Sequence, residues 1–436
     1  MYNAIEKAAS NFNKETQDKE IKIISHYDTD GITSASIMIK ALKRLDKRFS
    51  VKIIKQLESE ALEFKENDVV LFLDLASSAL NYLGKLKSKI YIIDHHEISQ
   101  TIPENITIIN PHLFGSEEIS GAGLSYLFAR ALSQENKDLA GLAVIGMVGD
   151  MLDKNISKIN KQILDEAEVI IKQGLLLYPA TRPINKALEF SSSLFIPGVT
   201  GSQSGAISLL SEAGIEKSNG EYKNLVDLTP EEMSRLITAV VLRRMHKHNE
   251  NILGNIYLVK FHGRLEDARE ISAMINACSR LEQSDISLLL CLGKKDIRKK
   301  TEEIYASYKQ HIVKALNHIE SLRKIEGKEY VIINAKDSIK DTIIGTVTSI
   351  LSNSPSYEEG TIIIGMAYNQ EKIKVSARIA GRNGRNIREV LETVTRNIGG
   401  ECGGHPLAAG CLINKENEDE FIKQIIKALE IEVVKI

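Results

Sequence analysis

The stretch Ile21–Ile32 reads IKIISHYDTDGI, and the interpretation of the whole chain starts from it. Its apolar start has the length of a buried strand, and Gly31 ends that pattern. Residues two apart on an extended backbone point the same way, so His26, Asp28 and Asp30 can face one point. Carboxylates and an imidazole that face one point repel one another or compete for protons unless a cation lies among them. We therefore expect a metal site, although both aspartates could instead cap the helix that follows.

The composition limits what the rest of the chain can be. A length of 436 residues predicts two or three domains with a sizeable core. The formal net charge of -2 gives no global signature of nucleic-acid binding, so a local patch or metal ions would have to bind any polyanion. The four cysteines form no CxxC pair, which argues against a zinc ribbon and a disulfide framework. Without a signal segment or a long apolar run, we expect a soluble, cytoplasmic protein with no membrane partner.

Short apolar runs alternate with helical patterns after Gly31. We expect a helix over Thr33–Leu45 and further strands at Val51–Ile54, Val69–Leu73, Ile90–Ile93 and Ile106–Ile109. Continuous apolar strands of this kind argue for a parallel sheet that is covered on both faces. In such sheets the ligand lies at the carboxyl ends of the strands.

Acidic and imidazole residues stand at these ends. Asp74 directly follows Val69–Leu73, and the triplet Asp94-His95-His96 follows Ile90–Ile93. Asp150 ends a predicted core helix, Leu139–Gly149. Asp and His ligands without thiolates suit Mn²⁺ or Mg²⁺. Because one ion needs fewer ligands, two ions about 3.5 to 4 Å apart are expected, the arrangement that phosphoryl transfer uses.

These motifs resemble those of the DHH phosphoesterase family. The resemblance rests on Ser25–Gly31, Asp74, Asp94-His95-His96 and Asp150, in that order. Near the C-terminus, Gly403–Gly410 (GGHPLAAG) is similar to the glycine and histidine motif of the companion DHHA1 domain. Within the family, the chain looks most like RecJ-type single-strand exonucleases. It looks closest to their archaeal relatives, which associate with the GINS replication complex and are related to the replication factor Cdc45.

The resemblance implies a role for each site residue. Two Mn²⁺ ions are expected, with Mg²⁺ as an alternative: the first takes His26 and Asp28, the second takes Asp30, His95 and Asp150, and Asp74 bridges them. Asp94 is expected to orient a ligand histidine, and His96 to contact the substrate phosphate. The residues expected to face the substrate strand are Ser376, Arg378, Gly403, Gly404 and His405. Cys402 departs from the family pattern, because many members have a further glycine there, and a position that requires positive φ would change the turn.

The expected fold class is α/β, with an N-terminal parallel-sheet DHH domain and a smaller C-terminal α/β DHHA1 domain joined by a long helix. We expect the catalytic domain over residues 1–190, a mostly helical insertion and connecting region over 191–300, and the linker helix with the DHHA1 domain over 301–436. Thr229 and Glu232 predict a capping box at a helix start. Helices are expected over Lys154–Gly174 and Glu302–Lys324, and strands of the smaller sheet over Tyr330–Asn334, Thr361–Gly365 and Lys372–Ile379.

The resemblance indicates a Mn²⁺-dependent phosphodiesterase that degrades single-stranded DNA or RNA as an exonuclease in DNA replication or repair. Two alternatives stay open. One is a DHH enzyme that acts on nanoRNA or cyclic dinucleotides, and the other is a Cdc45-like scaffold that binds GINS without catalysis. All four N-terminal motifs are intact, which weakens the scaffold alternative.

Overall fold

The computed structural model describes residues 1–57, 64–65, 68–191, 194, 196–244, 252–354, 356–381 and 383–430. The chain forms two compact units, of which the first ends at Tyr305 and the second begins at Ala306. That boundary lies within a long helix, α12 (Ile297–Ser321). The N-terminal unit contains a parallel sheet and the smaller C-terminal unit is also α/β, so the predicted fold class is confirmed. The domain boundaries near residues 190 and 300 stay predictions.

The sheet that carries the candidate site is parallel throughout, with strand order β2-β1-β3-β4-β5. β3 and β5 have the predicted bounds, whereas β2 and β4 begin earlier. All five residues of β3 are buried, as expected for a central strand that is covered on both faces. The strands are β1 (Ile21–His26), β2 (Phe49–Ile54), β3 (Val69–Leu73), β4 (Lys89–Ile93) and β5 (Ile106–Ile109).

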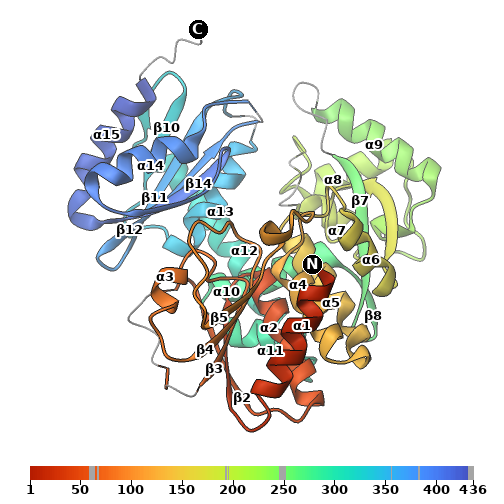
Figure 1. The fold of residues 1–436 in the computed structure, drawn as a ribbon. Helices are drawn as coiled ribbons and strands as arrows, with labels where there is room; N and C mark the ends of the chain where they lie inside the picture. Colours follow the sequence, from red (N-terminus) through yellow and green to blue (C-terminus); the bar gives the residue numbers. More distant parts are fainter. Residues whose placement is uncertain are drawn as a thin grey trace. The chain divides into compact units, whose positions relative to one another are not determined.

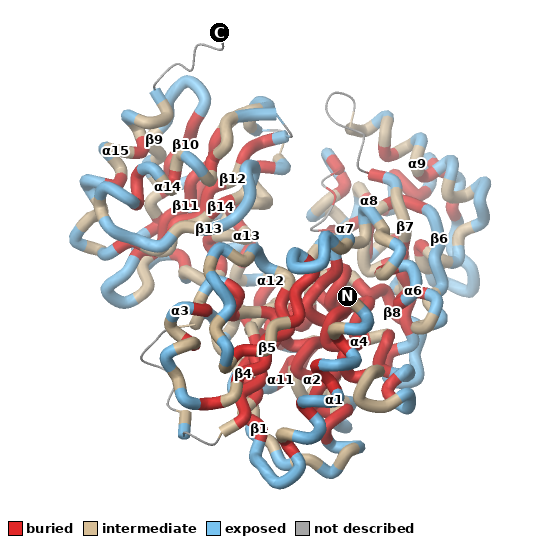
Figure 2. The backbone as a smooth tube through the Cα atoms, viewed as in Figure 1, coloured by how far each residue is buried: buried red, intermediate tan, exposed pale blue. Residues whose placement is uncertain are grey.

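Helices cover this sheet unequally (Figure 1). One face carries α1 (Tyr2–Glu15), α2 (Thr29–Arg44) and α4 (Gly121–Leu132), with α5 (Ala140–Gly149) packed on α2 and α4. The other carries the short α3 (Leu80–Leu83), and β4 connects to β5 without a helix. Strands and inner helix faces form a continuous buried region (Figure 2). α2 corresponds to the helix expected over Thr33–Leu45, but it starts four residues earlier, at Thr29, directly beside the candidate site.

A second, antiparallel sheet of order β6-β7-β8 lies in the middle of the chain and corrects one prediction. The helix expected over Lys154–Gly174 is wrong in its second half, because α6 (Lys158–Glu166) ends and β6 (Ile170–Leu175) follows. β6 pairs with a strand more than 75 residues later in the chain, so local periodicity could not reveal it. The other elements here are α7 (Ile184–Glu189), α8 (Gln203–Glu212), α9 (Pro230–Arg244), β7 (Leu253–Phe261), β8 (Arg264–Asp267), α10 (Ala268–Arg280) and α11 (Ser284–Cys291).

The predicted capping box at α9 is confirmed by two reciprocal hydrogen bonds. The backbone N–H of Glu232 donates to Thr229 Oγ1 at 3.2 Å, and the backbone N–H of Thr229 donates to the Glu232 carboxylate at 2.8 Å. No helix in the described part of the chain has an apolar run long enough to cross a bilayer.

The C-terminal unit contains a mixed sheet of order β13-β14-β12-β11-β10-β9. Among the described residues of this sheet, β10 and β11 pair in parallel and the other neighbouring strands pair antiparallel. α13 (Asp341–Ser352) packs on one face, while α14 (Ile387–Ile398) and α15 (Glu418–Glu430) cover the other. The strands are β9 (Ile325–Glu326), β10 (Tyr330–Asn334), β11 (Ile362–Asn369), β12 (Lys372–Ile379), β13 (Glu401–His405) and β14 (Ala408–Asn414). β10 and β12 have the predicted bounds.

Close packing around α5 yields a testable expectation. A Cβ added at Gly146 would lie 2.4 Å from Ala122 Cβ and 2.5 Å from Asp30 Oδ1. We expect Gly146→Ala to lower the free energy of unfolding by about 1 to 3 kcal/mol, the usual cost of overpacking a core. Urea denaturation measures the change.

The matched control is Gly141→Ala in the same helix. A Cβ at Gly141 would meet only Lys260 O, at 3.8 Å. Alanine should therefore stabilise the protein there by up to about 1 kcal/mol through helix propensity. Equal effects of the two substitutions would contradict this account of the packing.

Candidate metal centre

β1 and the start of α2 bring the first three candidate residues together. β1 ends at His26, and Asp28 is the N-cap of α2, where its Oδ1 accepts a hydrogen bond from the Gly31 N–H at 3.0 Å. The second oxygen, Oδ2, lies 3.0 Å from His26 Nδ1. The helix cap that the sequence allowed for Asp28 is therefore confirmed for one oxygen, while the other faces His26 and its metal role stays a prediction.

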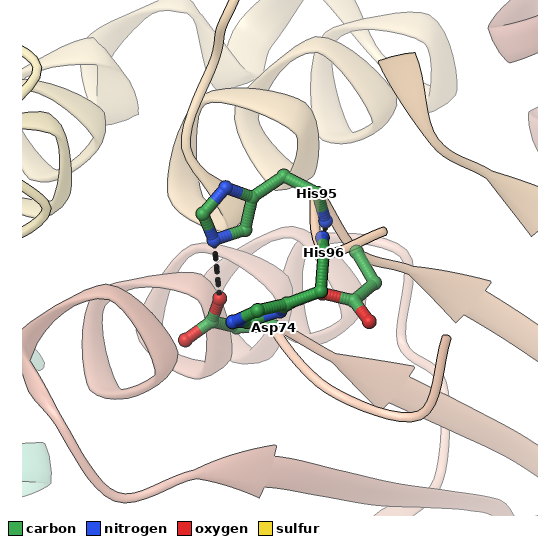
Figure 3. A group of neighbouring side chains, drawn as sticks. Asp74, His95 and His96 are labelled. Atoms are coloured by element: carbon green, nitrogen blue, oxygen red, sulfur yellow. Dashed lines mark hydrogen bonds and ion pairs between the residues drawn. The ribbon is translucent and has the colours of Figure 1, made fainter. Parts of the chain in front are cut away.

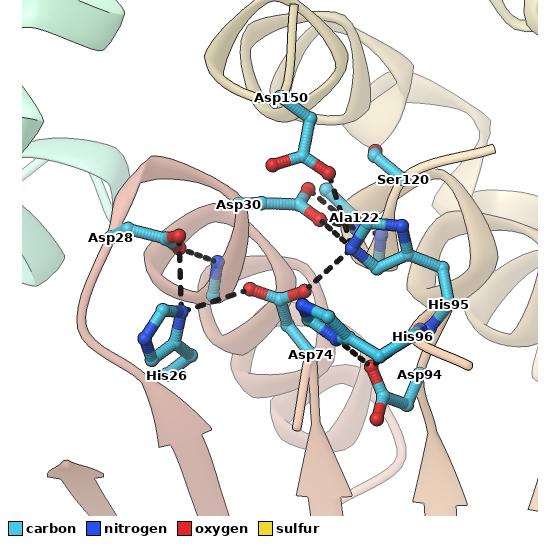
Figure 4. A network of polar contacts seen from close by, with 12 residues as sticks. His26, Asp28, Asp30, Asp74, Asp94, His95, His96, Ser120, Ala122 and Asp150 are labelled. Carbon is cyan, nitrogen blue, oxygen red and sulfur yellow. Dashed lines mark hydrogen bonds and ion pairs between the residues drawn. The ribbon is translucent and has the colours of Figure 1, made fainter. Parts of the chain in front are cut away.

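Asp74 lies between the imidazoles of His95 and His26: Figure 3 shows its contact with His95, and Figure 4 shows both contacts. Its Oδ1 is 3.3 Å from His95 Nε2, and its Oδ2 is 3.5 Å from His26 Nδ1. The residue directly follows β3 and has a φ of 58°, a conformation that Asp and Asn adopt more readily than most side chains. With this backbone conformation the Asp74 carboxylate is only 2% exposed, and each of its oxygens contacts a different histidine.

His95 connects Asp74 with two further carboxylates (Figure 4). Its Nε2 lies 3.2 Å from Asp150 Oδ2 and 3.8 Å from Asp30 Oδ2. Asp150 is the C-cap residue of α5, and Asp30 lies in the first turn of α2. Two helices and two strand ends thus supply one polar cluster at the carboxyl edge of the sheet.

The partners of Asp30 were not foreseen. Its two oxygens accept hydrogen bonds from the Gly121 and Ala122 N–H groups at 2.6 and 2.9 Å. These N–H groups belong to the first turn of α4, where the helix dipole also favours a negative charge. A Cβ at Gly121 would lie only 2.8 Å from Asp74, so the small residue allows this approach. Small residues after Ser120, which caps α4, are the sequence signal that could have indicated an anion-holding helix start.

α10 supports the same turn from another side. Asn276 Oδ1 accepts from the Thr29 N–H at 3.1 Å, and the Thr29 hydroxyl donates to Ser272 O at 3.0 Å. No chemical role for this helix could be predicted from its sequence. Its structural role is to hold the residue between Asp28 and Asp30.

Asp94 has a different ring partner from the one expected. Its Oδ1 is 2.7 Å from Nδ1 of His96 and accepts the His95 backbone N–H at 2.8 Å, whereas no hydrogen bond joins it to the His95 ring among the contacts described. Its Oδ2 accepts the Ser77 N–H at 2.9 Å. The fully buried Asp94 therefore orients His96, whose side chain is 57% exposed.

Burial and mutual repulsion shift the protonation of the cluster. Burial lowers the pKa of His95, but the close contact with Asp74 and the charges of the nearby carboxylates outweigh it and raise the pKa to about 11. Burial and the charges of Asp74 and Asp28 raise the pKa of Asp150 to about 7, although His95 opposes them. The pKa of Asp30 is also raised, by burial first and then by Asp150 and Asp74. The cluster therefore holds more negative charge than its environment tolerates without protons or cations.

The geometry fits two cations. Within the described residues, ligand atoms that lie within 4.8 Å of one another form the groups His26-Asp28-Asp74 and Asp30-His95-Asp150, besides Asp74-Asp94-His95-His96. Three buried atoms of the first two groups lie at ion-pair distance from a neighbour but do not meet hydrogen-bond geometry, namely His26 Nδ1, Asp74 Oδ1 and Asp150 Oδ2. Buried polar atoms without hydrogen bonds are costly, and oxygen and imidazole donors suit Mn²⁺ or Mg²⁺.

The second unit places four of the five predicted strand-facing residues on one face of its sheet. Ser376 and Arg378 of β12 lie on the face that α13 partly covers, and the register continues this face to Gly403 and His405 of β13. Gly404 lies on the opposite face, next to buried Ala409. β13 is an edge strand, and its Gly403 and His405 are exposed.

Cys402 lies at the position where many members of the family have a further glycine, and it does not have the positive φ that would favour glycine there. It lies in β13 directly opposite Cys411 of β14, and both cysteines are free.

Family models match three parts of the chain. The DHH family, N-terminal domain, matches residues 20–147, and the DHHA1 domain matches residues 304–430. The DHH-CID domain matches residues 177–252, between them.

Two curated proteins are similar over nearly the whole chain. An uncharacterised protein of Methanocaldococcus jannaschii is 29% identical, and the match covers 93% of this chain and 92% of that protein. The single-stranded-DNA-specific exonuclease RecJ of Bacillus subtilis is 22% identical over 92% of this chain. The chain spans only 44% of the length of that RecJ.

Solved structures share the fold. RecJ of Thermus thermophilus in complex with Mn²⁺ superposes with a TM-score of 0.62 at 19% identity, covering 98% of this chain and 55% of that one. Cdc45 of Entamoeba histolytica gives a TM-score of 0.63 at 14% identity, covering 98% and 99%. Taken with the domain models at both ends of the chain and the RecJ homologue, these matches make the chain a RecJ-like member of the DHH/DHHA1 family.

Proposed function

We propose that the protein is a two-metal phosphodiesterase that degrades single-stranded DNA or RNA as an exonuclease. Mn²⁺ is the proposed ion, with Mg²⁺ as an alternative, and the proposed setting is DNA replication or repair in the cytoplasm. The choice of substrate is supported by the RecJ homologue, a single-stranded-DNA-specific exonuclease, and the choice of ion by the RecJ structure in complex with Mn²⁺.

The carrying observation is the position of Asp74. Its two oxygens face different ligand groups, so one carboxylate can bridge two ions. We assign His26 and Asp28 to the first ion, and Asp30, His95 and Asp150 to the second. When bound, such a pair of divalent cations lowers the pKa of an attacking water and neutralises charge on the phosphate oxygens.

The protein's own residues would orient the substrate. His96 is exposed while its Nδ1 is fixed by Asp94, so its other ring nitrogen is available to donate to a phosphate oxygen. The hydrogen bond to Asp94 and the charge of Asp94 raise the pKa of His96, burial lowers it, and the net shift is upward. An imidazolium is thereby favoured, which suits contact with an anion.

The second unit is proposed to hold the strand. Ser376, Arg378, Gly403 and His405 share one face of its sheet, and Gly404 is proposed to act by letting the backbone approach closely. Backbone N–H groups, a hydroxyl and cationic side chains are common phosphate partners. With no Trp and 5% aromatic residues, contacts to the nucleic-acid backbone should outweigh base stacking.

A second candidate function is a replication scaffold like Cdc45. The fold match to Cdc45 spans nearly all of both chains, which favours this candidate, and GINS is the partner that it would bind. The two functions are compatible, because scaffolding does not require the loss of the metal ligands.

Removal of the bridging carboxylate tests the two-metal assignment. We expect Asp74→Asn to lower Mn²⁺-dependent hydrolysis of end-labelled single-stranded DNA by at least about a hundredfold, as when other charge-stabilising groups are lost. Asn tolerates the positive φ of this position, so the fold should persist and circular dichroism should be unchanged. Asp68→Asn at the opposite end of β3 is the control. Undiminished hydrolysis in Asp74→Asn would refute the assignment.

The sheet face with Ser376, Arg378, Gly403 and His405, which we propose holds the strand, leads to a separate prediction. We expect His405→Ala to raise KM for a single-stranded oligonucleotide by about three- to tenfold, the loss of one hydrogen bond to a phosphate. Hydrolysis of bis(p-nitrophenyl) phosphate should stay unchanged, because this small ester has no nucleic-acid strand for the second unit to hold. His318→Ala, an exposed histidine of α12, is the control. A preference of the wild type for dinucleotides over long strands would instead favour a nanoRNA hydrolase.

The scaffold candidate is tested without catalysis. We expect the protein to co-purify with GINS in EDTA as well as in Mn²⁺, because the proposed contact does not use the metal ligands. Asp74→Asn should bind equally well. Failure of both proteins to bind GINS would exclude this second function.

A further inference from the structure

A fully buried amide ties three loops together at the carboxyl edge of the sheet. Asn110, which directly follows β5, donates from Nδ2 to Ser77 Oγ at 3.0 Å and to His96 O at 2.8 Å. Its Oδ1 accepts the His112 N–H at 3.0 Å. Ser77, His96 and His112 follow β3, β4 and β5 respectively, so one side chain joins the loops after three neighbouring strands.

These contacts form a closed ring of hydrogen bonds around His96. Asn110 holds the Ser77 hydroxyl, and the Ser77 N–H donates to Asp94 Oδ2. Asp94 Oδ1 then bonds the His96 ring, and the His96 carbonyl returns to Asn110. The exposed imidazole is therefore fixed at its ring nitrogen by Asp94 and at its backbone by Asn110.

This closed cycle of hydrogen bonds is needed because the segment after β4 has no helix or strand to support it. Residues 94–96 follow the last residue of β4 as irregular backbone. A half-exposed imidazole on such a segment would sample several positions unless buried polar groups restrict it. Asp94 can fix the His96 imidazole only if the Asp94 carboxylate is itself held in place. The Ser77 N–H holds the second oxygen of that carboxylate.

We propose that Asn110 is a positioning residue that acts through His96. The amide aligns the imidazole with the substrate phosphate without touching substrate or metal. This inference rests on the proposed phosphodiesterase function. Loss of such a supporting hydrogen bond usually lowers activity by about 10- to 100-fold.

Asn105 offers a matched control at the other end of β5. Its Nδ2 donates to backbone carbonyls, among them Leu86 O at 2.9 Å, and the residue lies away from the site. It is therefore an asparagine that serves local structure alone. Asn105→Ala should leave kcat unchanged even if it lowers the melting temperature.

The experiment is a double-mutant cycle on the full chain with Mn²⁺ and a single-stranded oligonucleotide. We expect Asn110→Ala to lower kcat by about 10- to 100-fold with KM and Mn²⁺ binding, measured by calorimetry, unchanged. In the His96→Gln background, Asn110→Ala should cause no further loss, because its effect passes through His96. Equal losses in both backgrounds, or an unchanged kcat, would overturn the proposal.

A second readout does not depend on activity. In protein with ¹⁵N-labelled histidine, the Nδ1–H signal of His96, assigned by its absence from His96→Gln, should shift or broaden in Asn110→Ala but not in Asn105→Ala. If the wild type hydrolyses nothing, the proposed function fails, and an unmoved signal would separately refute the positioning role. Ser77→Ala, which removes only the hydroxyl contact, provides the same two tests with a smaller effect if Asn110→Ala does not fold.

Discussion

Repulsion among four carboxylates at one edge of a sheet is the constraint on which the rest of the N-terminal unit depends. Asp28, Asp30, Asp74 and Asp150 lie around two imidazoles, and a flexible chain would let them move apart. Each is instead held by rigid structure: a helix start, the N–H groups of α4, a left-handed backbone turn and a helix end. The folding free energy of the core thus offsets the repulsion among these charges.

Much of this arrangement was predictable, because a parallel sheet turns positions in sequence into positions in space. The carboxyl ends of parallel strands meet at one edge, so polar residues directly after Val69–Leu73 and Ile90–Ile93 had to approach His26. The bounds of β3 and β5 followed from short, continuous apolar runs, whereas β2 and β4 also include polar residues and begin earlier than those runs. What the residues at the edge bind, and which ion each takes, stays a prediction.

Contacts made over long sequence separations were not predictable. The N–H groups that hold Asp30 come from residues about ninety positions later, and the amide that holds Thr29 comes from Asn276. Local patterns contain no information on such pairs. The same limit explains the error at Ile170–Leu175, where the apolar residues fit a helix locally but pair with β7. The ring partner of Asp94 is a local matter instead: His95 and His96 lie one and two residues further along the chain, and only the conformation of the turn directs the carboxylate to the His96 ring.

A row of residues without long side chains crosses the sheet of the C-terminal unit. Gly365, Ser376, Gly410 and Gly403 are directly paired from β11 to β13, and α13 covers only the first two. The open end of the row therefore offers glycine backbone alone. Backbone amides cannot tell one base from another, since every nucleotide carries the same phosphate and a similar sugar. A polymer that lay along this row would therefore meet contacts that do not depend on its sequence.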